Sequence, residues 1–176
     1  AASRLRRAIR GFFLDERAGA LNSFGDHSRR WHFSATVQAM GILTGVLTPN
    51  EAERIRPRLL KPEGWHPMSI STLWYGLRAL AGCTDPELQA STYEHVVQRF
   101  GRMVMQGSTT LWETDDGADD FDLAGSLCHG WSAVPLWFTQ ACVLGVTPAA
   151  PGFRRFRLDP QTAALPCASG AVPTPT

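Results

Sequence analysis

Residues 45–51 read Gly-Val-Leu-Thr-Pro-Asn-Glu, and this stretch predicts the end of one helix and the start of another. A glycine just past the last turn commonly ends a helix in the left-handed conformation. Thr48, Pro49 and Glu51 then match the N-cap, the first helical position and the glutamate of a capping box. We therefore expect two helices joined by a tight turn at this point.

The same pattern recurs farther along the chain. Residues 82–86 read Gly-Cys-Thr-Asp-Pro, so the glycine-to-proline spacing repeats after 37 positions, from Gly45 to Gly82. A third copy, Gly-Val-Thr-Pro at 145–148, follows the helix predicted over 133–144. Such repetition is typical of stacked helical hairpins. Both an open solenoid that binds partners and a closed ring of hairpins, as in several carbohydrate-active enzymes, fit this spacing.

Apolar periodicity predicts helices over 33–45, 49–60, 68–81 and 86–104. The residues expected to face the core are, in chain order, Phe33, Val37, Met40 or Gly41, Thr44, Ala52, Ile55, Leu59, Leu73, Leu77, Leu80, Leu88, Tyr93, Val96 or Val97, Phe100 and Val104. Several tryptophans and cysteines in apolar surroundings are expected to pack in the core as well, namely Trp31, Trp65, Trp74, Trp137, Cys83, Cys128 and Cys142.

The pattern changes near position 151. Residues 153–158 read Phe-Arg-Arg-Phe-Arg-Leu, and their partial alternation of apolar and basic side chains predicts a strand that Asp-Pro then ends. We therefore divide the chain into a helical domain over 1–150 and the start of a β domain over 151–176.

The composition is that of an ordinary globular domain. Of 176 residues, 44% are hydrophobic and 19% are charged, and the net charge of +1 selects neither nucleic acid nor a membrane as a partner. There is no apolar run of the roughly 18–20 residues that a membrane span needs and no signal-peptide core, which favours a cytoplasmic location. The chain starts without methionine and ends in a Pro/Thr-rich stretch, so we expect a piece of a longer protein.

Two charged features near the N-terminus favour structural interpretations. Arg6 and Arg10 share one face of a predicted helix, and we expect that face to be solvated. Asp15 and Glu16 stand between Phe-Phe-Leu and Arg-Ala-Gly, a context typical of a helix end that leads into a turn.

Candidate chemistry is concentrated in the loop over 107–126, which interrupts the hairpins. Glu113 follows Trp112 and two threonines. A tryptophan face can stack on the apolar face of a sugar ring, and a nearby carboxylate can accept a proton from a hydroxyl or a water. Glycoside hydrolysis uses two such carboxylates. The simpler alternative is a surface glutamate in an acidic loop.

Five aspartates crowd positions 115–122 in the same loop. They lack the spacing and the closing glutamate of an EF-hand, so a solvated acidic loop is favoured over a calcium site, and no metal ligand is assigned. Downstream, residues 126–132 read Ser-Leu-Cys-His-Gly-Trp-Ser. His129 and Trp131 could line a cleft, or His129 could be a hydrogen-bonded structural residue at a helix start.

Taken together, residues 107–113, 126–133, 143–146 and 151–153 resemble the α-L-rhamnosidases, which are six-hairpin glycosidases with an (α/α)6 barrel. The resemblance extends into Leu-Asp-Pro at 158–160 and into 170–175, which look like the opening of the family's C-terminal β-sandwich. Upstream, 33–53 and 68–82 look like its later barrel hairpins. The resemblance implies an all-α chain that forms the C-terminal half of the barrel, with a short β extension.

The resemblance also implies an activity. It is the inverting hydrolysis of terminal α-L-rhamnose from rhamnosides or rhamnose-containing polysaccharides, without a cofactor. Glu113 would be the general base that activates water, His129 would bind the sugar, and Trp131 and Trp112 would shape the pocket. The family's general acid and most of its sugar contacts belong to an earlier barrel segment that is absent from these residues. We therefore expect little or no activity from the isolated chain.

One position departs from the family pattern, because Thr36 stands where many relatives carry histidine. Two alternatives stay open at this point. The chain could belong to another six-hairpin enzyme that acts on a different sugar, or it could be a non-catalytic helical-repeat binding module.

Overall fold

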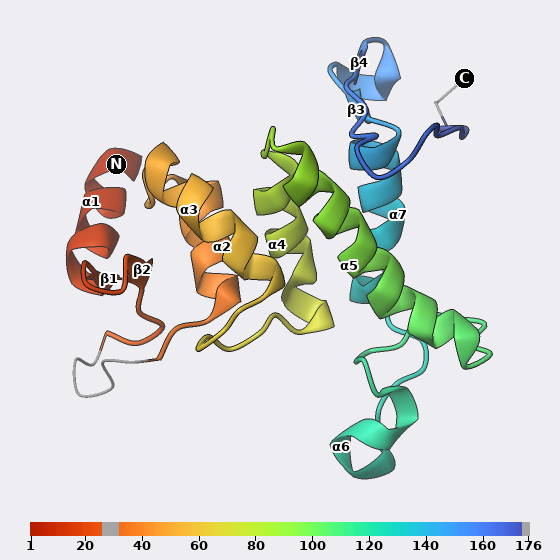
Figure 1. Ribbon diagram of the computed structural model, residues 1–176, viewed down its shortest axis with the longest axis horizontal. Coiled ribbons are helices and arrows are strands. Elements are labelled where there is room, and N and C mark those ends of the chain that lie inside the picture. The colour runs from red at the N-terminus through yellow and green to blue at the C-terminus, as the bar shows by residue number, and fades with distance from the viewer. Residues whose placement is uncertain (26–31, 174–176) are drawn as a thin grey trace. The chain divides into compact units, whose positions relative to one another are not determined.

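The computed structural model describes residues 1–25 and 32–173 (Figure 1). These residues are mostly helical, as predicted. The chain divides into two compact units, Ala1–Cys83 and Thr84–Thr176, and each is described by itself. Trp31, expected in the core, lies outside the described residues. Within the described ranges, every helix is too short or too polar to cross a membrane.

The first unit combines helices with a short β-hairpin. Its elements are α1 (Ala2–Phe13), β1 (Leu14–Asp15), β2 (Ala20–Leu21), α2 (Ala35–Thr44), α3 (Pro49–Leu60) and α4 (Ile70–Ala81). Strands β1 and β2 are antiparallel, and the Asp15 carboxylate accepts hydrogen bonds from the backbone N–H groups of Arg17 and Ala18. This confirms the turn predicted after α1. Helix α2 packs against both α3 and α4.

The turn between α2 and α3 forms as the sequence predicts. Gly45 ends α2 with a φ of 69°. The Thr48 hydroxyl accepts from the N–H of Glu51, and the Glu51 carboxylate accepts from the N–H of Thr48 at 2.8 Å, which completes the capping box. The buried stripe of α3 is also the expected one, consisting of Ala52, Ile55 and Leu59.

The buried face of α2 agrees with the prediction in part. Gly41, the alternative to the exposed Met40, is buried, but Thr44 is exposed, so its predicted core position is wrong. Because α2 is apolar on most sides, periodicity does not single out a face, and close packing decides instead. A Cβ at Gly41 would lie 2.5 Å from a methyl group of Leu21. The buried Gln38 amide also bonds the backbone of Leu21, accepting at 2.8 Å and donating at 2.7 Å.

The arginine face of α1 has no buried residue, in agreement with the predicted solvated face, but both arginines also bond to the α2–α3 turn. Arg6 donates to the carbonyl of Thr44 at 2.6 Å. Arg10 donates to both carboxylate oxygens of Glu51, at 2.7 and 2.8 Å. The guanidinium groups reach the ends of neighbouring helices, a contact that the spacing of apolar residues does not reveal.

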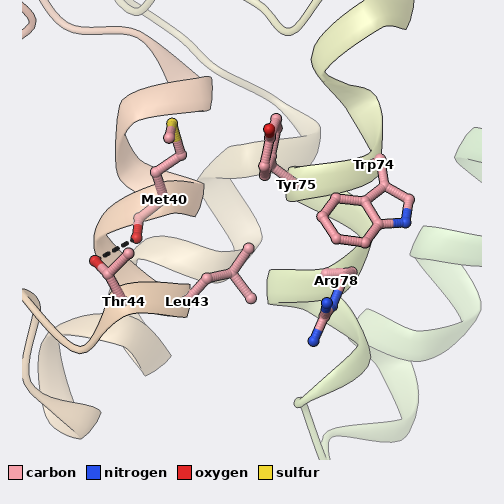
Figure 2. Close-up of a pocket in the computed structure, with 6 residues that line it drawn as sticks. All are labelled: Met40, Leu43, Thr44, Trp74, Tyr75 and Arg78. Atoms are coloured by element: carbon pink, nitrogen blue, oxygen red, sulfur yellow. Dashed lines mark hydrogen bonds between the residues drawn. The ribbon is translucent and has the colours of Figure 1, made fainter. Parts of the chain in front are cut away.

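Helix α4 begins at Ile70, two residues later than predicted, and buries the expected stripe of Leu73, Leu77 and Leu80. A surface groove of about 230 Å³ lies between α2 and α4 (Figure 2). Figure 2 shows Leu43 and Trp74 pointing toward the space between the two helices. Trp74 is 38% exposed, so its predicted core position is wrong, whereas Trp65 is buried as expected.

The second unit begins with a long helix and continues through short elements. They are α5 (Pro86–Met105), η2 (Gly117–Asp119), α6 (Asp120–Leu123), η3 (Gly130–Ala133), α7 (Val134–Phe138), η4 (Thr139–Val143), β3 (Val146–Pro148), η5 (Pro151–Phe153) and β4 (Phe156–Leu158). Asp85 caps α5 and Pro86 occupies its first position, as predicted. The predicted stripe is wrong at its end, because Met103 is buried and Val104 is 67% exposed.

The helix predicted over 133–144 is irregular. It starts as the 3-10 turn η3, continues as α7 and ends in the π-helical turn η4. Gly145 follows with a φ of 69°. A Cβ at this glycine would lie 2.2 Å from the backbone of Asp159, so only glycine lets the two backbone segments approach this closely.

Strands β3 and β4 form an antiparallel hairpin with Val146 opposite Leu158. The predicted strand over 153–158 is confirmed only for 156–158, because residues 151–153 form a 3-10 turn in which Gly152 has a φ of 65°. The hairpin pairs residues on both sides of position 150, and the domain division there stays a prediction.

Of the three cysteines predicted to lie in the core, two are buried. Cys83 and Cys142 are buried, but Cys128 is exposed, so its predicted core position is wrong. Cys128 lies in the segment that leads into η3, where backbone hydrogen bonds rather than apolar packing hold the chain.

Candidate active site

The candidate site is built at the neck of the loop between α5 and η3. The backbone N–H of Glu113 donates to the carbonyl of Ser126 at 2.8 Å, and the N–H of His129 donates to the carbonyl of Leu111 at 2.9 Å. These bonds hold the outgoing and returning segments of the loop together. Residues 13 to 18 positions apart in the sequence therefore meet at the loop neck.

The Glu113 carboxylate has one oxygen fixed and the other near an imidazole. Oε2 accepts from the backbone N–H of Ser126 at 3.1 Å. Oε1 lies 3.8 Å from Nδ1 of His129. The Glu113 side chain is 20% exposed and that of His129 is 30% exposed. The carboxylate is thus oriented by the protein and still reachable by water, as a general base must be.

His129 and Trp131 form an aromatic pair beside this carboxylate. Their ring centroids are 3.6 Å apart with an interplanar angle of 30°. The indole N–H of Trp131 donates to the carbonyl oxygen of Glu113 at 3.2 Å, and Trp131 is 45% exposed. His129 immediately precedes η3, the helix start that the sequence predicts for it. Three of the predicted site residues are therefore brought together.

Trp112 has a different environment. A Cβ at Gly117 would lie 2.6 Å from its indole ring, so the loop backbone packs directly on that ring. The hydroxyl of Ser132 also donates to the carbonyl oxygen of Trp112. Trp112 therefore supports the loop from within, and its direct contact with sugar stays a prediction.

The acidic loop is tied to helix α5. Arg99 donates from Nε and Nη2 to the two carboxylate oxygens of Asp115, at 2.6 and 2.5 Å. Nη2 of Arg102 lies 3.9 Å from Oδ1 of Asp116. Asp115 is therefore ion-paired while its side chain stays 37% exposed. Among residues 1–25 and 32–173, no three His, Cys, Asp or Glu side chains are grouped in a way that could hold a metal ion.

Sequence reasoning missed Arg99. A usable signal was present, because two arginines three residues apart on one helix precede two adjacent aspartates in the next loop. Beside this pair, burial and the charge of Arg99 lower the pKa of His95, while Asp115 opposes the effect. His95 and Arg99 of α5 and Asp115 of the loop are thus electrostatically coupled.

Comparison with known proteins gives two informative matches. The chain is 30% identical over 80 residues to an α-L-rhamnosidase of Alteromonas sp. (strain LOR), a match that covers 42% of this chain and 9% of that protein. A crystal structure of a GH78 family rhamnosidase of Bacillus sp. GL1 superposes with a TM-score of 0.77 at 25% identity, covering 92% of this chain and 18% of that one. The resemblance to the α-L-rhamnosidases is confirmed.

These rhamnosidases are much longer than the chain, which spans about a tenth of the first and less than a fifth of the second. The match to the solved rhamnosidase covers nearly all of this chain, and its helical fold agrees with the helices described above. No protein-family model matches the sequence.

Proposed function

We propose that this chain belongs to an inverting α-L-rhamnosidase and forms the C-terminal half of its (α/α)6 barrel, with Glu113 as the general base. The observation that carries the proposal is the fixed, accessible Glu113 carboxylate beside His129 and Trp131. It is supported by the similarity of the chain to α-L-rhamnosidases. The substrate class is a glycoside or polysaccharide with a terminal α-L-rhamnose.

The chemistry assigned to Glu113 follows from its two oxygens. Oε2 is occupied by the Ser126 N–H, so Oε1 is the oxygen that takes the proton from a water. The water oxygen attacks the anomeric carbon, the glycosidic C–O bond breaks, and a general acid gives its proton to the departing oxygen. In an inverting enzyme the two carboxyl groups lie about 6.5–9.5 Å apart, which leaves room for that water.

His129 and Trp131 are assigned to the sugar. An imidazole can donate a hydrogen bond to a hydroxyl group, and an indole face can pack on the apolar C–H face of a ring. His129 also lies within 3.8 Å of Oε1, so a sugar bound to it would sit next to the base. This arrangement favours a sugar-binding role for His129 over a purely structural one.

The general acid is expected in the earlier barrel segment that the family resemblance implies. Each half of an acid–base pair typically contributes about 10²–10⁴ in rate. We therefore expect the isolated 176-residue chain to hydrolyse rhamnosides weakly or not at all.

The test is to express the complete open reading frame that contains this sequence and to assay it on 4-nitrophenyl α-L-rhamnopyranoside. Glu113→Gln should lower kcat about 10²–10⁴-fold. Glu94→Gln makes the same chemical change at an exposed position on α5 and should leave kcat unchanged. The first product observed by NMR should be β-L-rhamnose. Full activity in Glu113→Gln would refute the assignment of the base, and activity on another glycoside alone would favour a different six-hairpin enzyme.

A further inference from the structure

The contact between Arg99 and Asp115 links the candidate base to the longest helix described. Arg99 donates two parallel hydrogen bonds to Asp115, and the two side chains are 15% and 37% exposed. Asp115 stands two residues after Glu113. We propose that Arg99 is a positioning residue for Glu113, and this inference rests on the proposed function.

Glu113 is held from two sides. Ser126 and Trp131, which bond it directly, lie after it in the chain, within the same loop and in η3. Arg99 lies before it, on α5, a helix of 20 residues with a buried stripe. The ion pair therefore transmits the position of α5 to the loop. Without it, the returning segment could still pair with Glu113, but the whole neck could shift relative to the helix.

The geometry distinguishes Arg99 from its neighbour. Two-pronged arginine–carboxylate pairs with short bonds are among the strong polar contacts in proteins. By contrast, the Arg102–Asp116 pair is 3.9 Å long, its side chains are 62% and 70% exposed, and such surface pairs contribute little. The second pair joins the same helix to the same loop, so it is a matched control.

The kinetic test uses the enzyme encoded by the complete reading frame. Because a displacement of about 1 Å can cost about 10²-fold in rate, Arg99→Gln should lower kcat about 10–100-fold, with KM changed less than about threefold. Asp115→Asn should act similarly, and the double variant should be no worse than either single one. Arg102→Gln should leave kcat within about twofold. Additive losses in the double variant, or equal losses from Arg102→Gln, would overturn the inference.

A second readout does not depend on turnover. In the protein encoded by the complete reading frame, hydrogen exchange of the Trp131 indole N–H reports on its bond to Glu113. Arg99→Gln should speed this exchange about tenfold without changing the amide of Val96, which is buried on α5. Unchanged indole exchange would overturn the inference. If Glu113→Gln keeps full activity, the proposed function fails. The exchange rate of the Trp131 indole N–H in Arg99→Gln still shows whether Arg99 holds Glu113 in place.

Discussion

Glu113 and Ser126 bond each other twice: the N–H of Glu113 donates to the Ser126 carbonyl at 2.8 Å, and the N–H of Ser126 donates to Oε2 of Glu113 at 3.1 Å. The side chain proposed for catalysis is thus also part of the closure of its own loop. A change that opens the loop neck should therefore disturb the carboxylate directly, even if it lies outside the site.

Gly125→Ala should be such a change. A Cβ at this position would lie 1.8 Å from the carbonyl oxygen of Gly117, and backbone cannot move aside easily. We expect a loss of about 1–3 kcal/mol of stability. Gly101→Ala on α5 is the control, because its Cβ would meet nothing within 4 Å, and it should stabilise by about 0.5–1 kcal/mol. Equal unfolding midpoints for the two variants would contradict this account.

Glu51 should make stability depend on acid pH. Hydrogen bonding to Arg10 and to Thr48 lowers the pKa of Glu51 from 4.5 to about 2. A carboxyl whose pKa is lower in the folded state contributes stability above its unfolded pKa, and this contribution is lost as the pH falls from about 4.5 to about 2. Glu51→Gln should cost about 1–3 kcal/mol at pH 7, measured by urea unfolding.

Glu53→Gln is the matched control for this prediction. Glu53 lies in the same helix and pairs with Arg56, but its side chain is 61% exposed. Its loss should cost less than about 0.5 kcal/mol. A Glu51→Gln protein that keeps the full acid sensitivity of the original would show that another carboxyl is responsible.

Sequence patterns located the elements governed by local rules. The turn from Gly45 to Thr48 and the start of α5 at Asp85 depend on residues close in the sequence, and both form as predicted. The buried face of α2 depends on which neighbours approach it, and there Thr44 is exposed although periodicity placed it inside. Long side chains behave similarly, because the partner of Arg10 is 41 residues away.

In the candidate site, too, short sequence motifs predict some features, and contacts between distant residues determine the others. Glu113, His129 and Trp131 were singled out from short motifs, and they lie together because the loop neck joins those motifs. Arg99 belongs to no motif, since its role depends on the spatial relation of α5 to the loop. Resemblance to a family therefore indicated the residues proposed for the chemistry, and only the structure indicated what supports them.

The reactivity of the four thiols offers a direct check of the packing in both units. Cys128 is exposed and adjoins His129, whereas Cys142 is buried, and burial raises its pKa to about 11. At pH 8 we expect iodoacetamide to modify Cys128 and Cys167 in the native chain, and Cys83 and Cys142 only after unfolding. Peptide mass spectrometry would report the order. Modification of Cys142 as fast as Cys128 would contradict the packing described for η4.

The pKa of His95 is lowered below 6.5 chiefly by burial and then by the charge of Arg99, while Asp115 acts in the opposite direction. Because the unfolded chain binds this proton more readily, stability should rise with pH as His95 loses its proton, up to about pH 6.5. Arg99→Gln removes the neighbouring positive charge, so the pKa of His95 should rise, whereas Asp115→Asn should lower it further. NMR titration of the His95 ring measures both shifts. Shifts of the same sign in the two variants would mean that the ion pair affects His95 mainly by moving the loop, not through its charges.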